Sequence, residues 1–369
     1  MFLTRSLHHG GAERQLTTLA IGLKQQKYDV SVAAFYGNGT FETNLAAANI
    51  PVFNLNKQGR WDTLGFFIQL FRLIKQERPA IVHSYLAIPN ILAATIKILN
   101  PKIKILWGIR ASEIDLEQHD WLTRVSYKIE ALMSRLANNI IANSQAGRSF
   151  AIHNGFSPQS ITVIANGIDT EYFKIDTTTR LSMRHAWGIQ PDEVAIGIVG
   201  RLDPVKEHKL FLDAAAQVAA THNNVKFICV GDGPSIYTSQ LKRDANDRGL
   251  NGRIVWLSAQ DNMPPVYNSL DILVSSSSSE GFSNVIAEAM SCGIPCVATK
   301  VGDSTLIVGE TGIMVPPKNA PELASALRTM IDQPTDLRHA RGASARARVE
   351  SLFSIAELVR QTEEVMEKL

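Results

Sequence analysis

Hydrophobic positions along this chain fall into two alternating kinds of segment. Short runs rich in β-branched residues are typical of strands, and longer segments with apolar residues at helical spacing are typical of amphipathic helices. The predicted strands are residues 30–35, 80–83, 103–109, 139–143, 161–165, 194–199, 226–230, 254–257, 272–275 and 295–299. The predicted helices are residues 12–25, 63–76, 121–136, 209–221 and 235–248. Several strands are apolar throughout, which indicates parallel strands covered by helices on both faces.

This alternation of strands and helices occurs twice. The first set ends before the turn signal Asn166–Gly167, and the second begins at Val194. We therefore expect an α/β fold of two Rossmann-like, doubly wound domains, residues 1–166 and 167–352, that face a shared cleft. Open parallel sheets bind ligands beyond the carboxyl ends of their strands, so both domains would present that end to the cleft. The amphipathic segment 353–369 could pack on the second domain or return to the first.

Length and composition agree with a globular protein of two domains. The chain has 369 residues, of which 45% are hydrophobic and 20% charged, and both fractions are ordinary. It contains no apolar run of about 18 residues and no signal-peptide pattern at its start. Its three cysteines give no even disulfide framework. We therefore expect a cytoplasmic protein in a reducing compartment.

The charge is unevenly spread along the chain. Residues 1–169 carry 17 basic and 11 acidic side chains, and the remainder carries 20 and 24. A basic first half fits an anionic partner such as a lipid phosphate, although ordinary variation between domains explains it equally well. The apolar and basic segment LGFFIQLFRLIK, residues 64–75, either covers the sheet or lies on the inner face of a membrane. Peripheral membrane contact is left open, and nucleic acid is not expected as a partner.

A first candidate site follows the strand that ends at Gly200, in GRLDPVKEHKLFLDA. Arg201 and Lys206 lie in the loop between this strand and the next helix. A helix N-terminus offers backbone N–H donors and a partial positive charge. Two cations beside it would suit a diphosphate, with the arginine as a fork and the lysine as a point charge. Two solvated loop cations are the alternative.

A second candidate site is the stretch EGFSNVIAEAMSCGIPCV, which begins at Glu280. Glu280 lies in a loop after a strand, and Gly281 lets the backbone pass close to a ligand. A short helix begins near Asn284, and Glu288 lies just over one turn inside it. A carboxylate there can accept hydrogen bonds from vicinal hydroxyls, and its apolar neighbours make a ligand hydroxyl or a cation the favoured partner. The helix start offers the amides of Phe282, Ser283 and Asn284.

In this order, GRLDPVK and EGFSNVIAE resemble the retaining glycosyltransferases of family 4, also called group 1, of the bacterial surface-polysaccharide type. These enzymes have the GT-B fold of two Rossmann-like domains. Further blocks carry the resemblance over essentially the whole chain: SLHHGGAERQL, AIVHSYL, IIANSQAG, VIANGIDTEYF, FICVGDGP and PCVATKVGDSTLIVGETGIMVP. The resemblance implies that the first domain binds an acceptor and the second a nucleotide-sugar donor.

The resemblance also implies roles for the candidate residues. Arg201 and Lys206 would hold the donor diphosphate, while Glu280 and the nearby amides would bind the sugar and Glu288 the ribose. Gly11 would bring its backbone N–H close to the phosphate or the acceptor. The base would meet mainly backbone atoms of Leu257, Ser258 and Ala259. The chain has no D-x-D pair, so no metal and no other cofactor is expected.

The first domain departs from the family at one position that bears on the reaction. Many members carry a histidine at the end of a strand where this chain has Arg110. Arginine cannot act as a base at neutral pH but can donate hydrogen bonds to the donor or to an anionic acceptor. A structural ion pair with Glu113 or Asp115 is the alternative.

Other first-domain residues and the cysteines have less specific readings. His83, at the end of a predicted strand, and His9, beside the glycine loop, are candidates for the acceptor side. A core histidine is the favoured alternative for His83, and the spacing of His8 and His9 matches no metal motif. Cys292 and Cys296 are expected to be buried thiols. The first strand is expected to be short, because only the six residues MFLTRS precede LHHGG.

The function indicated is a retaining, metal-independent glycosyltransferase. It would move a sugar from a uridine, or else a guanosine, diphosphate donor to a saccharide or lipid-linked acceptor in polysaccharide or lipopolysaccharide assembly. A nucleotide-sugar epimerase on the same fold and a non-catalytic nucleotide-sugar sensor are the alternatives. A dinucleotide oxidoreductase is disfavoured because no full G-x-G-x-x-G follows the early strands.

Overall fold

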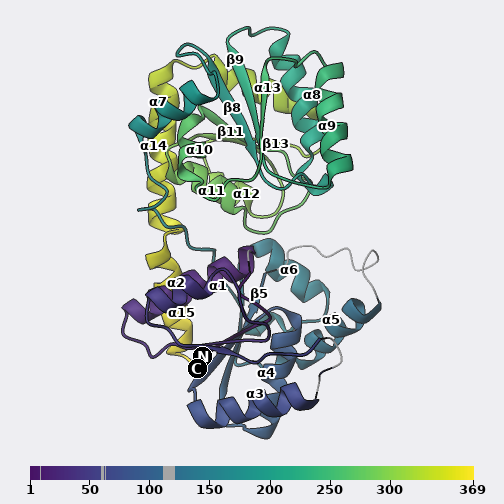
Figure 1. The fold of residues 1–369 in the computed structure, drawn as a ribbon, viewed down its shortest axis with the longest axis vertical. Helices are drawn as coiled ribbons and strands as arrows, with labels where there is room; N and C mark the ends of the chain where they lie inside the picture. Colours follow the sequence, from purple (N-terminus) through teal and green to yellow (C-terminus); the bar gives the residue numbers. More distant parts are fainter. Residues whose placement is uncertain (9, 60–61, 63, 111–120) are drawn as a thin grey trace. The chain divides into compact units, whose positions relative to one another are not determined.

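The computed structural model describes residues 1–8, 10–59, 62, 64–110 and 121–369 (Figure 1). The chain divides into two compact units. The first unit consists of Met1–Gly167 and Ile355–Leu369, and the second unit consists of Ile168–Ser354. The final segment therefore returns to the first unit, which answers the question that its sequence left open.

The first unit is built on a seven-stranded sheet in the order β3-β2-β1-β4-β5-β6-β7, in which the recorded strand pairings are parallel. Its strands are β1 (Phe2–Thr4), β2 (Val32–Ala34), β3 (Val52–Asn54), β4 (Ile81–Tyr85), β5 (Lys104–Ile109), β6 (Asn139–Ala142) and β7 (Ile161–Val163). Its helices are α1 (Gly11–Gln25), α2 (Glu42–Ala47), α3 (Leu64–Glu77), α4 (Ala87–Leu99), α5 (Trp121–Met133), α6 (Gln145–His153) and α15 (Ile355–Met366).

Helices cover both faces of this sheet, as the apolar strands predict. Phe66 of α3, Ala93 of α4 and Tyr127 of α5 are buried against one face. Leu16 of α1 and Leu358 of α15 are buried against the other face. The segment 64–75 therefore lies in a helix that covers the sheet, one of the two readings that its sequence allowed.

The second unit is built on a six-stranded sheet in the order β10-β9-β8-β11-β12-β13, again with parallel pairings. Its strands are β8 (Val194–Val199), β9 (Val225–Val230), β10 (Ile254–Leu257), β11 (Ile272–Ser275), β12 (Cys296–Thr299) and β13 (Ile313–Val315). Its helices are α7 (Thr177–Ala186), α8 (His208–Ala219), α9 (Ser235–Asp247), α10 (Pro264–Ser269), α11 (Asn284–Ser291), α12 (Ser304–Val308), α13 (Ala320–Ile331) and α14 (Thr335–Leu352).

In the second unit, helices cover the sheet and both predicted donor loops leave the sheet at the same edge. Helices α8, α9 and α13 bury side chains such as Phe211, Leu241 and Leu327 against the strands. The neighbouring strands β8 and β11 pair in parallel, so the loops that follow them leave the sheet at the same edge.

In the first unit, strand β1 is only three residues long, which agrees with the short first strand expected from the sequence.

The three cysteines are free and buried, which confirms the expectation for Cys292 and Cys296. Burial raises the pKa of the Cys292 thiol to about 12, so this thiol is unreactive at neutral pH. No helix within the described part of the chain is both long enough and apolar enough to cross a membrane.

Candidate functional site

Lys206 and Glu280 meet in an ion pair at the carboxyl edge of the second unit's sheet. The Lys206 Nζ lies 2.5 Å from Glu280 Oε1, and both side chains are largely buried. The same carboxylate oxygen accepts a hydrogen bond of 2.7 Å from the Ser277 hydroxyl. Sequence reasoning found the lysine and the glutamate but missed Ser277, whose only signal is its place in the serine run before Glu280.

The loop that carries the two cations is held from several directions. Asp203 accepts a hydrogen bond of 3.0 Å from the Val205 amide, and the Ser276 hydroxyl donates to the backbone oxygen of Lys206 at 2.9 Å. Arg201 is 82% exposed, and its only recorded ion pair is a 3.7 Å contact with Asp203. Lys206 is therefore fixed beside Glu280, whereas the guanidinium of Arg201 extends into solvent from the same loop.

Glycines let the loops at this edge approach each other closely. A Cβ added to Gly231 would lie 1.9 Å from the backbone oxygen of Gly200, and one added to Gly302 would lie 2.0 Å from that of Glu280. The Asp303 amide also donates to the backbone oxygen of Gly281 at 3.0 Å. Gly231, the first glycine of the GDG stretch, is thus required because a side chain there would clash with the loop that carries Arg201 and Lys206. Gly302, which sequence reasoning did not single out, supports the Glu280 loop.

Helix α11 begins beside this loop, as its sequence predicts. Ser283 is its N-cap, with an extended backbone and no hydrogen bond from its side chain to the helix. Phe282 is buried and packs edge-on against Phe353 with ring centroids 5.4 Å apart. Gly293 follows the helix with φ of +74°, the conformation expected of a glycine at that place. The backbone N–H groups in the first turn of α11, from Asn284 onward, therefore lie next to the loop that carries Glu280.

Glu288 is buried in α11, whose neighbouring residues are apolar. Its Oε2 accepts a hydrogen bond of 2.7 Å from the Tyr267 hydroxyl of α10. The sequence favoured a ligand hydroxyl or a cation as its partner, and the Tyr267 phenol is one partner that the protein itself supplies. Tyr267 had no local signal, because its contact depends on how α10 packs against α11.

The loop after β10 contains the three residues expected beside a nucleotide base. Leu257 ends the strand and its backbone oxygen accepts from the Gly231 amide at 2.9 Å. The Ala259 amide donates to Asp232 Oδ2 at 3.0 Å, and Ser258 and Ala259 are exposed. The strand order places this loop two strands from the cation loop, at the same edge of the sheet.

In the first unit, Arg110 follows β5 directly, as expected. Its guanidinium donates to Asn166 Oδ1 at 2.8 Å and to the Tyr85 hydroxyl at 2.7 Å, and it lies 4.6 Å from the centre of the Tyr85 ring. Both partners are neutral, and sequence reasoning did not identify either of them. Glu113 and Asp115, the proposed acidic partners, lie outside the described residues.

The two other first-domain candidates are placed differently. Gly11 is the first residue of α1, where its amide belongs to the helix N-terminus. His9 lies outside the described residues.

His83 is not at the end of its strand, which continues to Tyr85. Its side chain is only 4% exposed and its ring lies 5.2 Å from that of Phe2 and 4.8 Å from that of Tyr85. Burial, with the nearby charge of Arg110, lowers the pKa of His83 well below its usual value. The structure therefore holds a neutral core imidazole here, since a contact with an acceptor needs more exposure than this ring has.

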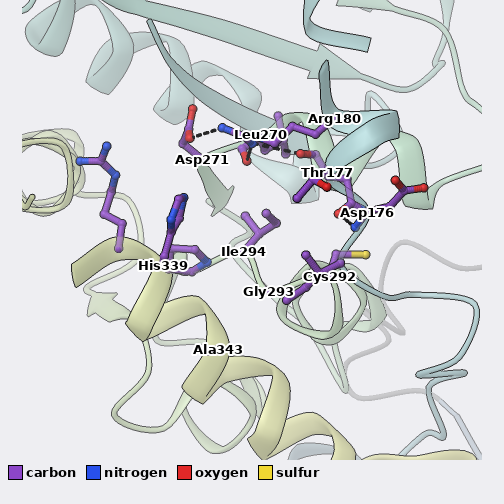
Figure 2. Close-up of a pocket in the computed structure, with 14 residues that line it drawn as sticks. Asp176, Thr177, Arg180, Leu270, Asp271, Cys292, Gly293, Ile294, His339 and Ala343 are labelled. Atoms are coloured by element: carbon purple, nitrogen blue, oxygen red, sulfur yellow. Dashed lines mark hydrogen bonds and ion pairs between the residues drawn. The ribbon is translucent and has the colours of Figure 1, made fainter. Parts of the chain in front are cut away.

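A separate cavity of about 250 Å³ lies at the other edge of the second unit's sheet (Figure 2). Asp271 and Pro295, which precede β11 and β12, line it together with Ile294 and His339. Its Asp271 carboxylate is paired with Arg180 at 2.6 Å, as the dashed line in Figure 2 marks. None of the predicted donor or acceptor residues lines this cavity, so it is not part of the candidate site.

Among the residues that the structure describes, no group of three or more His, Cys, Asp or Glu side chains is arranged to hold a metal ion.

Comparison with known families gives two matches that together cover most of the chain. Residues 193–333 match the family described as "Glycosyl transferases group 1", and residues 9–172 match "Glycosyltransferase Family 4". These two stretches contain the donor loops and the first-unit candidates respectively.

The chain is also similar to individual curated relatives and to solved structures. The D-inositol 3-phosphate glycosyltransferase of Rhodococcus opacus is 32% identical over 54% of this chain and 47% of its own length. The chain thus spans about half the length of these curated relatives. The N-acetyl-alpha-D-glucosaminyl L-malate synthase of Bacillus anthracis is 25% identical over 80% of this chain and 77% of its own.

The crystal structure of Anabaena Alr3699/HepE in complex with UDP is 25% identical and covers 100% of this chain and 99% of its own, with a TM-score of 0.87. The same protein has been crystallised with UDP-glucose.

Proposed function

Because this chain belongs to the group 1 glycosyltransferases of family 4, we propose that it transfers a sugar from a nucleotide diphosphate donor to an acceptor, with retention at the anomeric carbon. The observation that carries the proposal is the ion pair between Lys206 and Glu280, which joins the loop after β8 to the loop after β11. One partner suits the diphosphate and the other the sugar hydroxyls. In the absence of a donor, the charges of Lys206 and Glu280 neutralise each other.

The chemistry requires stabilisation of the leaving nucleotide. Negative charge grows on the phosphate oxygens as the bond to the anomeric carbon breaks. A fixed lysine, an arginine on the same loop and helix N-termini at this edge can stabilise that charge. This set needs neither a metal nor another cofactor. Retention would follow from attack on the same face, assisted by the leaving phosphate, with Glu280 positioning the sugar rather than forming a bond to it.

A uridine diphosphate sugar is the donor that we favour. HepE, at 25% identity over the full chain, binds UDP and UDP-glucose. The loop of Leu257, Ser258 and Ala259 would contact the base mainly through its backbone, so its side chains do not discriminate uridine from guanosine. Glu288 would reach the ribose by exchanging or sharing its hydrogen bond with Tyr267.

The acceptor site would lie in the first unit, around Arg110. Its guanidinium donates hydrogen bonds to Asn166 and Tyr85. Both groups are neutral, so they do not offset its positive charge. An anionic or hydroxyl-rich acceptor suits such a group. Two relatives carry inositol 3-phosphate or malate in their names, and both of these molecules are anionic. We propose a saccharide or lipid-linked acceptor in polysaccharide or lipopolysaccharide assembly, at the inner face of the membrane.

Calorimetry with nucleoside diphosphates in the presence of EDTA tests the donor site. We expect UDP to bind without metal and Lys206→Ala to weaken that binding at least tenfold, because a charge-assisted contact to phosphate is lost. Arg201→Ala should weaken it less, since its side chain is more exposed. Lys242→Ala, on the exposed side of α9, is the matched control. Absence of UDP and GDP binding, or equal affinities for Lys206→Ala and Lys242→Ala, would reject the site.

Turnover separates transfer from the alternatives. A transferase should release nucleotide from UDP-glucose far faster once an acceptor saccharide is added, and NMR of the product should show the anomeric configuration of the donor. An epimerase would convert the donor sugar without any acceptor, and a sensor would bind the donor with no product.

A further inference from the structure

A run of five serines, residues 275–279, leads from the end of β11 to Glu280. Judged by composition alone, a serine run is typical of a flexible linker. In the structure its first three members are instead buried, with 8%, 1% and 2% of their surfaces exposed. A buried hydroxyl is costly unless it has a hydrogen-bond partner. The partners of these serines therefore indicate what the run does.

The serine run is bonded to the loop after β8, the neighbouring strand in the second unit's sheet (Figure 1). The Ser276 hydroxyl lies 2.9 Å from the backbone oxygen of Lys206 and 3.1 Å from that of Glu207. The Ser278 amide donates to the backbone oxygen of Val205 at 2.9 Å. These bonds fix the backbones of the two donor loops relative to each other.

Ser277 differs from its neighbours because its hydroxyl acts on a side chain. It donates to Glu280 Oε1 at 2.7 Å, the same oxygen that lies 2.5 Å from Lys206 Nζ. The backbone oxygen of Ser277 accepts a hydrogen bond of 2.6 Å from the hydroxyl of Thr299, a fully buried residue at the end of β12. The sheet therefore holds Ser277, and the Ser277 hydroxyl fixes one carboxylate oxygen of Glu280.

The two oxygens of the Glu280 carboxylate have different surroundings. Within the described part of the chain, the recorded hydrogen bonds reach Oε1 and none reaches Oε2. An ionised carboxylate has lone pairs on both oxygens, so Oε2 can accept from a hydroxyl of a ligand. Because the Ser277 hydroxyl is neutral, it orients the carboxylate without offsetting the negative charge that such a bond uses.

We propose that Ser277 is a positioning residue for the donor sugar, and that it holds Glu280 Oε1 so that Oε2 accepts from a sugar hydroxyl. This role rests on the proposed function, in which Glu280 binds the sugar and Lys206 the diphosphate. Once Lys206 binds the diphosphate, the Ser277 hydroxyl is the remaining recorded bond to Glu280 Oε1. A carboxylate fixed in one orientation favours one hydroxyl configuration, so Ser277 also contributes to the choice between epimeric sugars.

Calorimetry separates the sugar contact from the nucleotide contact. Its ligands are the nucleotide sugar that the turnover assay identifies, the free nucleoside diphosphate and the C4 epimer; for UDP-glucose these are UDP and UDP-galactose. We expect Ser277→Ala to weaken binding of the nucleotide sugar about tenfold, because a hydrogen bond to a charged group is lost, and to change UDP affinity by less than about twofold. The preference for the donor over its C4 epimer should fall about fivefold.

Two other serines of the run serve as comparisons. Ser276→Ala should weaken the nucleotide and the nucleotide sugar alike, since Ser276 bonds the backbone of Lys206 and not the carboxylate of Glu280. Ser279→Ala is the matched control, because the Ser279 side chain is half-buried and makes none of these bonds. The circular dichroism of all three variants should match that of the unchanged chain.

A double-mutant cycle tests whether Ser277 acts through Glu280. In the Glu280→Ala chain, the further change Ser277→Ala should alter binding of the nucleotide sugar by less than about twofold, since the carboxylate that the hydroxyl orients is gone. Additivity in this cycle, equal losses for UDP and the nucleotide sugar in Ser277→Ala, or equal effects of Ser277→Ala and Ser279→Ala would each overturn the role of Ser277. If the unchanged chain neither binds nor turns over any nucleotide sugar, the proposed function itself is rejected and this role with it.

Discussion

Glu207 stands between Lys206 and helix α8 with φ of +51°, a conformation that L-residues with a Cβ adopt at a cost. Its position beside the ion pair means that strain is held at the edge of the candidate site. Sequence patterns do not reveal it, because a glutamate before a helix looks like an ordinary charged first-turn residue. A 3-10 turn, Pro204–Lys206, comes directly before this residue.

The strain predicts an order among substitutions at this position. Glu207→Gly and Glu207→Ala both remove the carboxylate from the helix start, but only the glycine relieves the strain. We expect the Glu207→Gly chain to be more stable by about 1 kcal/mol than the Glu207→Ala chain. Urea denaturation followed by amide exchange in β8 measures the difference. The opposite order would contradict strain at this position.

Glu288 shows how far sequence reasoning reaches at a single residue. Its apolar neighbours in the helix correctly predicted burial, because α11 buries Ile286, Ala287, Ala289 and Met290. The identity of its partner was not predictable, since Tyr267 comes from a helix 21 positions earlier. For Lys206 and Glu280 the common sheet edge was predictable from the strand pattern, but their direct ion pair was not.

At the scale of elements, helix α15 packs against α1 through a close contact. A Cβ on Gly22 would lie 2.4 Å from Val359 Cγ2, and the next nearest atom, on Ile355, would be 3.5 Å away. Gly22→Ala should therefore destabilise the first unit by about 1–3 kcal/mol through overpacking. In a Val359→Ala background the same change should stabilise the helix by up to about 1 kcal/mol.

A double-mutant cycle on thermal or urea unfolding measures this reversal. Additive effects of Gly22→Ala and Val359→Ala, to within about 0.5 kcal/mol, would mean that the two residues are not in contact.

Helices α4 and α5 are joined by a buried polar chain that makes the first unit sensitive to pH. Ser84 donates to Asn90 at 2.7 Å, and Asn90 donates to Glu130 at 2.7 Å. Burial raises the pKa of Glu130 to about 7 from its usual value near 4.5. Between these two pH values the folded state binds more protons than the unfolded state. The contribution of Glu130 to stability therefore falls as pH rises from about 4.5 to 7.

Glu130→Gln tests this dependence, because the amide oxygen can still accept from Asn90. At pH 8 the variant should be more stable than the unchanged chain by about 3 kcal/mol, and at pH 4 the two should be nearly equal. Hydrogen exchange of β4 and β5 amides reports the first unit alone. A gap that does not change with pH would show that the pKa of Glu130 is not raised in the folded state.

The strands themselves were largely predictable. Val194–Val199, Ile254–Leu257 and Ile272–Ser275 have the limits that their apolar runs indicate. The sequence did not reveal β3 and β13, which are three-residue strands at the edges of their sheets. Such short runs carry too little pattern to separate from loops. Their pairing depends on neighbours far away in the chain.

At the scale of the whole molecule, the donor residues Arg201, Lys206, Glu280 and Glu288 all belong to the second unit. Nucleotide binding should therefore stabilise the two units unequally. UDP at a free concentration of 100 times its dissociation constant should raise the unfolding free energy of the second unit by about 2.7 kcal/mol. Hydrogen exchange should slow in β8 and β11 much more than in β1 and β4. Equal slowing in both sets would contradict a nucleotide site formed mainly by the second unit.

The return of the chain to the first unit has a consequence for biosynthesis. Every residue of the second unit has been synthesised once Ser354 is added, but α1 still lacks the cover that Leu358 and Val359 provide. The unit that begins the chain is thus the last to be completed. During translation its uncovered face would be available to chaperones while the later unit already folds. A chain that ends near residue 354 should therefore be cleaved by proteases in the first unit rather than in the second unit.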